Sequence, residues 1–173
     1  MPKSRRTVPN DGRKYSSQVA KIKVVPDTGF ILQATLNPSG PANAASLVLE
    51  TEEYEIYLSP QVREEIEDVL TRPAIRAKYP KLGDGRVEAM LQRLDIKSHL
   101  VTVIRTYMEF PRDPDDEPIL NVAIQEQADY ILARDKDLFD LGKSKDFRLL
   151  YPYLKIVDPA TFLQTLSIRQ EPE

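Results

Sequence analysis

The sequence of 173 residues contains no cysteine, no tryptophan and a single histidine, His99. The lack of cysteine excludes disulfides, thiolate metal sites and cysteine nucleophiles. One histidine leaves almost no material for a histidine-rich zinc site or a serine–histidine triad, and nothing in the sequence gives His99 a catalytic role. A metal ion would therefore be held by carboxylate oxygens, which favours Mg²⁺ or Mn²⁺.

Long apolar runs are also absent. No stretch is long enough to span a bilayer, and the basic N-terminus is not followed by the apolar core of a secretion signal. We therefore expect a cytoplasmic protein with no membrane partner. The charged fraction of 29% and the apolar fraction of 41% are those of an ordinary globular chain. The length suits one domain with a sizeable core.

The net charge of −3 hides an asymmetry between the N-terminus and the rest of the chain. Residues 1–21 carry six basic residues and one acidic residue, a net +5, so the remaining residues must sum to −8. This opening segment has few large apolar residues and is predicted to be a flexible arm. It is either a solvated tail or a basic arm that contacts nucleic-acid phosphates. The predicted domain then covers residues 22–166, and a short tail covers residues 167–173.

The first buried run, Ile22–Leu32, leads from β-branched residues straight into Asp27 and then into a helix-compatible stretch. In an open α/β sheet, ligands collect beyond the carboxyl ends of the strands, which is where Asp27 lies. A carboxylate in such a place is costly to desolvate unless a partner pairs with it, and a metal ion is one candidate.

A strong helix is predicted from Pro60 to about Thr71, with Ser59 as its N-cap. Its four acids are Glu64, Glu65, Glu67 and Asp68. At about 100° per residue, Glu65 lies nearest the apolar stripe of this helix. If one of the acids faces inward, it is Glu65; the alternative is that all four are solvated.

The other elements follow from apolar periodicity and turn residues. Further helices are predicted over Thr28–Thr35, Ala42–Thr51, Pro73–Tyr79 and a segment ending near Ser98. Further strands are predicted over Tyr54–Leu58 and Leu100–Ile104. Helices alternate with strands throughout, which predicts a parallel sheet with helices on both faces.

Two more acidic stretches stand beside buried elements. The run Arg112–Pro118 precedes a helix that is apolar over a wide arc, and Asp116 is its best N-cap candidate. The helix dipole would hold that carboxylate ionised, a suitable state for binding a cation. The alternative is that this acidic run is a solvated loop. The short strand from Tyr130 ends on Asp135, with Asp137 two residues later. Right-handed crossovers place Asp27 and Asp135 at the same edge of the sheet.

Together these stretches resemble the PIN domain family. The similarity rests on four motifs in order and on the last strand and helix. The four motifs are Val25–Thr28, Leu58–Ile66, Asp113–Asp116 and Ala133–Leu138. The nearest branch is that of toxin components in toxin–antitoxin systems. The resemblance covers about Ile22 to Leu166.

The resemblance implies an α/β/α sandwich whose acids bind one or two Mg²⁺ or Mn²⁺ ions for hydrolysis of RNA phosphodiester bonds. Matched to this sequence, the catalytic and metal-binding acids are Asp27, Glu65, Asp116 and Asp135, with Asp137 as an auxiliary ligand and Thr28 in support. The expected partners are RNA, an antitoxin protein and a second copy of the chain in a homodimer.

An acidic cluster repels RNA, so separate basic groups must hold the RNA backbone. The residues that flank the acids, Arg112, Arg134 and Lys136, are the candidates.

The sequence departs from the family pattern at two places near the acids. Gly29 stands where asparagine is common, and Ala133 stands where threonine or serine is common. Loss of polar groups that support metal ligands weakens metal binding about 10–100-fold. Neither change removes a carboxylate. Residues 142–153 also read as an insertion before the last strand.

Three other functions compete with the ribonuclease. The triplet Asp27-Thr28-Gly29 also occurs in aspartic proteases, but the predicted helices count against their all-β fold. A phosphatase with an aspartyl nucleophile would need a further acid where Gly29 stands. The serious alternative is a non-catalytic PIN-like module that binds RNA or a protein. Activity that a chelator abolishes would separate the enzyme from that module.

Overall fold

The computed structural model describes residues 19–170, so residues 1–18 of the predicted arm and 171–173 of the predicted tail lie outside it. The described chain folds around a five-stranded sheet with all strand pairs parallel, in the order β3-β2-β1-β4-β5. The strands are β1 (Ile22–Pro26), β2 (Tyr54–Leu58), β3 (Ser98–Leu100), β4 (Tyr130–Leu132) and β5 (Lys155–Val157). The predicted parallel sheet is confirmed.

Strand β1 lies at the centre because its apolar run can be covered on both faces. Val24 is fully buried and aligns with Ile56 of β2 and Tyr130 of β4. Both Val25 and its partner in register, Ile131, are buried as well. Continuous apolar strands of this kind are typical of a parallel sheet with helices on both sides.

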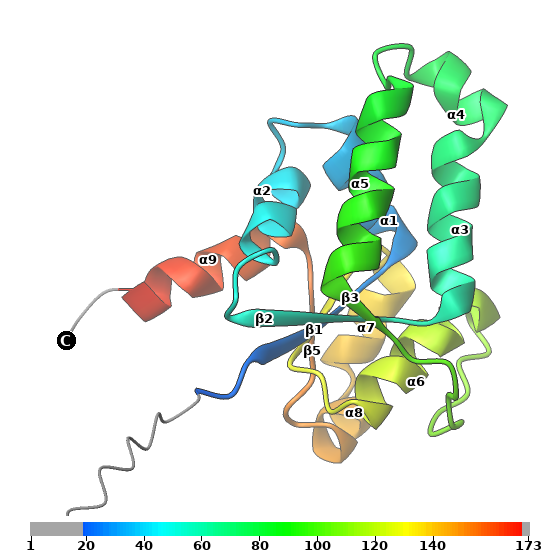
Figure 1. Ribbon diagram of the computed structural model, residues 1–173. Coiled ribbons are helices and arrows are strands. Elements are labelled where there is room, and N and C mark those ends of the chain that lie inside the picture. The colour runs from blue at the N-terminus through cyan, green and yellow to red at the C-terminus, as the bar shows by residue number, and fades with distance from the viewer. Residues whose placement is uncertain (1–18, 171–173) are drawn as a thin grey trace, which may run out of the picture.

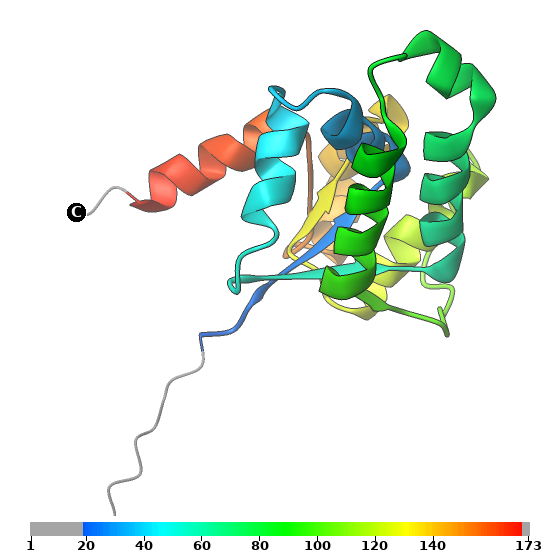
Figure 2. The ribbon, with the colours of Figure 1, turned by 45° about the horizontal axis from the view of Figure 1, so that its top comes forward.

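Helices cover both faces of the sheet (Figure 1). The connections from β1 to β2 and from β2 to β3 carry α1 (Thr28–Leu36), α2 (Pro41–Val48), α3 (Pro60–Thr71), α4 (Pro73–Lys78) and α5 (Asp84–Lys97). The opposite face carries α6 (Glu117–Gln125), α7 (Lys136–Lys143) and α8 (Lys145–Leu150). The last helix, α9 (Pro159–Gln170), returns to pack beside α2 and continues into the predicted tail. Figure 2 shows α3 and α5 side by side, joined by α4 at their far end.

The strand order places a topological switch point between β1 and β4. Chain connections leave β1 toward β2 and leave β4 toward β5, so the two adjacent strands diverge at their carboxyl ends. Ligands of open α/β sheets bind in the crevice at such a point. Asp27 directly follows β1, and Asp135 lies three residues after the end of β4.

The third strand is the main error of the sequence prediction. The predicted strand Leu100–Ile104 is wrong, because β3 ends at Leu100 and begins before it, at Ser98. Beyond Val101 the segment is bound by side chains of α6 instead of by strand β2. Gln125 accepts from the Arg105 N–H at 2.9 Å and donates to the Val103 carbonyl at 2.9 Å.

Two further side chains of α6 hydrogen-bond the backbone of the segment that leads to the acidic run. Asn121 accepts from the N–H groups of Tyr107 and Met108 and donates to the Met108 carbonyl. Glu117 accepts from the Phe110 N–H at 2.8 Å. Residues 117, 121 and 125 are spaced four apart and share one face of the helix. This face replaces a neighbouring strand and fixes the path of the chain up to Asp113.

Other differences are confined to element ends. Helix α2 ends at Val48 and not at Thr51, and α6 ends at Gln125. The segment read as an insertion forms the end of α7 and the whole of α8, and Phe147 anchors it with a fully buried ring. Among residues 19–170, no helix is long and apolar enough to cross a membrane.

Candidate metal centre

A hollow of about 400 Å³ opens at the carboxyl ends of β1 and β4. We call it the acid hollow because six carboxylates and one guanidinium line it. These charged residues are Asp27, Glu65, Asp113, Asp115, Asp116, Asp135 and Arg134. The four acids that the sequence analysis singled out are therefore brought together from four separate elements.

Asp27 is the most deeply buried of these acids, with a relative exposure of 5%. It is the N-cap of α1, and its Oδ1 accepts from the Phe30 N–H. Its Oδ2 accepts from the Arg134 N–H at 3.1 Å. Burial raises the pKa of the Asp27 carboxyl to about 6, against the lowering effect of these two hydrogen bonds. Strand β1, helix α1 and the end of β4 thus meet at one carboxylate.

Glu65 lies on α3 and reaches the acid hollow from its side. The Thr28 hydroxyl donates a hydrogen bond of 2.7 Å to Glu65 Oε2. This contact leaves Oε1 without a hydrogen bond among the described residues. The helical phase that singled out Glu65 among four acids agrees with its place in the hollow, and Thr28 orients its carboxylate.

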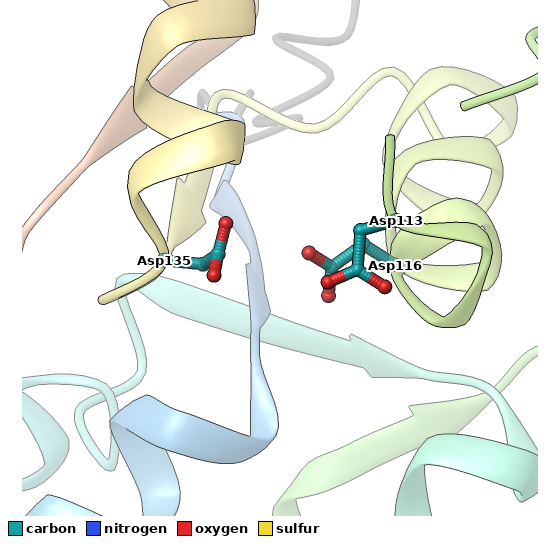
Figure 3. A group of neighbouring side chains, drawn as sticks. All are labelled: Asp113, Asp116 and Asp135. Atoms are coloured by element: carbon teal, nitrogen blue, oxygen red, sulfur yellow. The ribbon is translucent and has the colours of Figure 1, made fainter. Parts of the chain in front are cut away.

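Three acids form the tightest group. Asp113, Asp116 and Asp135 each place a carboxylate oxygen within 4.8 Å of the other two. Figure 3 shows Asp113 and Asp116 facing Asp135 across a gap. Oxygens on opposite sides of one Mg²⁺ ion lie about 4.2 Å apart, twice the metal–oxygen distance. Carboxylate oxygens this close together could share one divalent ion.

The role that the sequence gave Asp116 needs two corrections. Its backbone is helical, with φ −85° and ψ −9°, and its side chain caps nothing. It closes a short 3-10 turn, Pro114–Asp116, which Asp113 caps by accepting from the Asp115 N–H. The pKa of Asp116 is not held low by the helix dipole. Burial, followed by the charges of its acidic neighbours, raises it to about 7.

One oxygen of Asp116 is left without a partner. Within the described residues, Asp116 Oδ2 is buried and accepts no hydrogen bond. A buried carboxylate oxygen without a partner is costly, and coordination of a cation is one way to satisfy it. The donor set of carboxylate oxygens fits a hard divalent ion, Mg²⁺ or Mn²⁺.

Asp135 is the N-cap of α7, and only one of its carboxylate oxygens accepts the capping hydrogen bonds. Its Oδ1 accepts from the N–H groups of Asp137 and Leu138, at 2.7 and 3.2 Å. Its other oxygen makes no hydrogen bond within residues 19–170 and is free to take a ligand. The cap fixes the carboxylate, because two backbone bonds hold it at the end of a helix.

The remaining predicted residues lie around the hollow. Asp137 is not among its lining residues, and its Oδ1 pairs with Arg112 Nη2 at 3.1 Å. Arg112, Arg134 and Lys136 are exposed. Arg134 is a lining residue of the hollow, and its backbone N–H donates to the Asp27 carboxylate.

The sequence analysis missed Asp113 as a candidate ligand. The signal available was its position three residues before Asp116, which one 3-10 turn brings to the same side. Gly29, noted as a departure, faces Asp27: a Cβ placed there would lie 3.6 Å from both carboxylate oxygens. A side chain at this position would therefore rest against the most buried acid.

Comparison with known proteins agrees with this geometry. The chain matches the PIN domain family over residues 23–137. It is also 33% identical over 148 residues to an uncharacterized protein of Methanocaldococcus jannaschii. This match covers 83% of the present chain and 91% of the relative. The chain therefore belongs to the PIN domain family.

Proposed function

We propose that this protein is an endoribonuclease that depends on Mg²⁺ or Mn²⁺. PIN domains are generally metal-dependent nucleases, and PIN nucleases act on RNA. The observation that carries the proposal is the partnerless buried oxygen of Asp116, which lies beside Asp113 and Asp135 in a group spanning 4.8 Å. An acidic hollow of this kind is costly to keep in a folded protein without a cation.

The proposed ligands are Asp27, Glu65, Asp116 and Asp135, to which the geometry adds Asp113. A bound divalent ion would polarise a phosphoryl oxygen and lower the pKa of a bound water that attacks the phosphorus. The chain itself supplies fixed carboxylates. The backbone of Phe30 and Arg134 holds Asp27, while Thr28 holds Glu65. Asp137 is an auxiliary acid that can leave its pairing with Arg112.

Basic side chains at the rim would hold the RNA backbone. Arg134 is the best placed, because it lines the hollow among the acids. Lys136 follows on the exposed start of α7. Arg112 is partly neutralised by Asp137, so we expect its contribution to be the smallest of the three.

The test is cleavage of single-stranded RNA by the purified protein in Mn²⁺ and in EDTA. The wild type should cleave only with the metal, and Asp116→Asn should lose orders of magnitude of activity. Asp146→Asn is the matched control, because Asp146 is an exposed acid of α8 outside the hollow. Cleavage that persists in EDTA would contradict the proposal.

The alternative is a non-catalytic PIN-like module that binds RNA or a protein. Gly29 and Ala133 favour it, because polar groups common in the family are missing beside the acids. Under this alternative the wild type would bind RNA with no cleavage in Mg²⁺ or Mn²⁺. The same assay therefore decides between the two functions.

A cytoplasmic toxin of a toxin–antitoxin pair is the finer role that we propose, on the resemblance of the four sequence motifs to that branch. Its partners would be an antitoxin and a second copy of the chain. Induced expression in bacteria should then arrest growth, and Asp116→Asn should restore it. Normal growth with an active purified enzyme would indicate a stand-alone nuclease. Light scattering of the purified protein would test the homodimer.

A further inference from the structure

A second hollow, of about 350 Å³, adjoins the acid hollow and shares Arg134 with it. It lies between the second half of α1, the start of α2 and the start of α9. We call it the amide hollow after its two carboxamides. The lining residues that bear on its chemistry are Gln33, Asn37, Pro41, Arg134, Asp158 and Pro159.

One face of α1 leads from the acids into the amide hollow. Gly29 and Gln33 are four residues apart and lie along one side of the helix, and Asn37 follows four residues later as its C-cap. Gly29 lines the acid hollow, and the other two line the amide hollow. A Cβ at position 29 would lie 3.8 Å from Arg134 Cβ, so glycine leaves open the space beside the residue that the two hollows share.

The two hollows differ in charge. Six carboxylates and one guanidinium give the acid hollow a formal charge of −5 when all are ionised. In the amide hollow, Arg134 and Asp158 balance to zero. A polyanion whose scissile phosphate is held among the acids therefore meets less repulsion where its chain leaves across Arg134.

Polar groups of the amide hollow are free to bind a ligand. Within residues 19–170, the Gln33 carboxamide makes no hydrogen bond, and the Arg134 guanidinium makes no ion pair. Asn37 Oδ1 accepts a long bond of 3.3 Å from the Ser39 N–H, which leaves its NH₂ group available. Asp158, by contrast, is occupied by the N–H and hydroxyl of Thr161, at 2.9 and 2.7 Å.

We propose that the amide hollow binds the nucleotide next to the scissile phosphate of a single-stranded RNA. Arg134 binds the phosphate between the two hollows, Gln33 and Asn37 bond the base edge, and Pro41 and Pro159 give apolar contact to the sugar and base. Carboxamides suit this role, since they both donate and accept and carry no charge. A base can enter only when it is unpaired and unstacked, which selects single strands. This inference rests on the proposed ribonuclease function.

The test measures binding of a short, labelled single-stranded RNA of mixed sequence in a salt series. The Asp116→Asn background is used, so that cleavage does not obscure binding. Gln33→Ala should raise Kd about 5-fold, the value of a lost hydrogen bond or two, with an unchanged salt slope. Gln33→Glu should raise it further. Arg134→Ala should reduce the slope by about 0.7, because one phosphate contact is lost.

Gln92→Ala is the matched control, a glutamine on an exposed part of α5 away from both hollows. It should leave Kd unchanged. Thermal unfolding of each variant checks that the fold is intact. We expect Gln33→Ala to fold, because the Gln33 side chain makes no hydrogen bond within residues 19–170.

The outcomes separate this inference from the proposed function. Metal-dependent cleavage with equal Kd for Gln33→Ala, Gln33→Glu and the control would overturn the amide hollow as a subsite and leave the nuclease intact. If the wild type binds RNA and cleaves none, the nuclease fails, and the Kd series still decides the subsite. If RNA is neither bound nor cleaved, both fall.

Discussion

The Asp27 carboxylate accepts a hydrogen bond of 3.1 Å from the backbone N–H of Arg134, a residue 107 positions away in the chain. This bond ties the end of β1 to the end of β4 at the switch point of the sheet. Asp27 is therefore both a proposed metal ligand and a structural residue. Its substitutions must be read for both roles.

Asp27→Ala and Asp27→Asn should differ in stability and agree in metal response. Alanine removes both acceptors, so the free energy of unfolding should fall by about 1–3 kcal/mol. Asparagine keeps one acceptor and removes a buried charge, so its loss should be smaller. Stabilisation by Mn²⁺, measured as the shift in Tm, should shrink in both. Ser144→Ala is the control, because it loses the cap of α8 and no hollow residue. A full Mn²⁺ shift in Asp27→Asn would exclude Asp27 as a ligand.

Asp116 allows a cleaner test, since its side chain caps nothing. At pH 8, Asp116→Asn should raise the Tm of the metal-free protein, because it removes one charge from a crowded group. The same change should abolish most of the Mn²⁺ shift. Asp146→Asn should alter neither quantity. A destabilised metal-free variant with an intact Mn²⁺ shift would show that Asp116 is structural.

Thr28→Val tests the support of Glu65. The variant keeps the shape of the side chain and loses the 2.7 Å bond to Oε2. Glu65 should then lose its orientation, and Mn²⁺ affinity should fall about 10-fold with little change in Tm. Thr102→Val, at an exposed position, is the control. Equal affinity in the two variants would remove Thr28 from the site.

How far the sequence predicts this site depends on which interactions hold each residue. Asp27 and Asp135 follow from apolar strands that end in acids, and the parallel sheet brings such ends to one edge. Glu65 follows from helical phase. The place of Asp113 does not follow from a local pattern. It depends on the preceding segment, whose backbone is held against α6 by the side chains of Glu117 and Asn121. Local patterns carry no signal for such long-range bonds.

Hydrogen bonds from α6 side chains also explain why the predicted strand Leu100–Ile104 is wrong. Residues 101–104 are all β-branched and predict a strand, yet Gln125 binds the backbone groups of Val103 and Arg105 that a neighbouring strand would bind. The raised pKa of Asp116 could not be predicted from the sequence either. It comes from burial and from the charges of Asp113 in the same turn and of acids on other elements.

Asn121→Ala should destabilise the protein by about 2–4 kcal/mol, since it leaves backbone groups of Tyr107 and Met108 without partners. Asn121 is 4% exposed, so water cannot easily replace these bonds. Asn43→Ala loses a single bond to Pro38 and should cost less than about 1 kcal/mol. Urea unfolding measures both. Equal losses would show that the segment does not depend on Asn121.

As the pH rises, the stability of the metal-free protein should fall, while the Tm shift caused by Mn²⁺ should grow. The pKa values of Asp27 and Asp116 in the folded protein are about 6 and about 7, both raised from 3.8. Between pH 4 and 7 the folded state therefore binds more protons than the unfolded state, so the metal-free protein should lose stability as the pH rises. Mn²⁺ must displace the same protons, so its Tm shift should grow over that range. In Asp116→Asn both trends should end near pH 6, where Asp27 alone titrates. A Tm shift that is constant from pH 5 to 8 would show that neither carboxyl must ionise for the metal to bind.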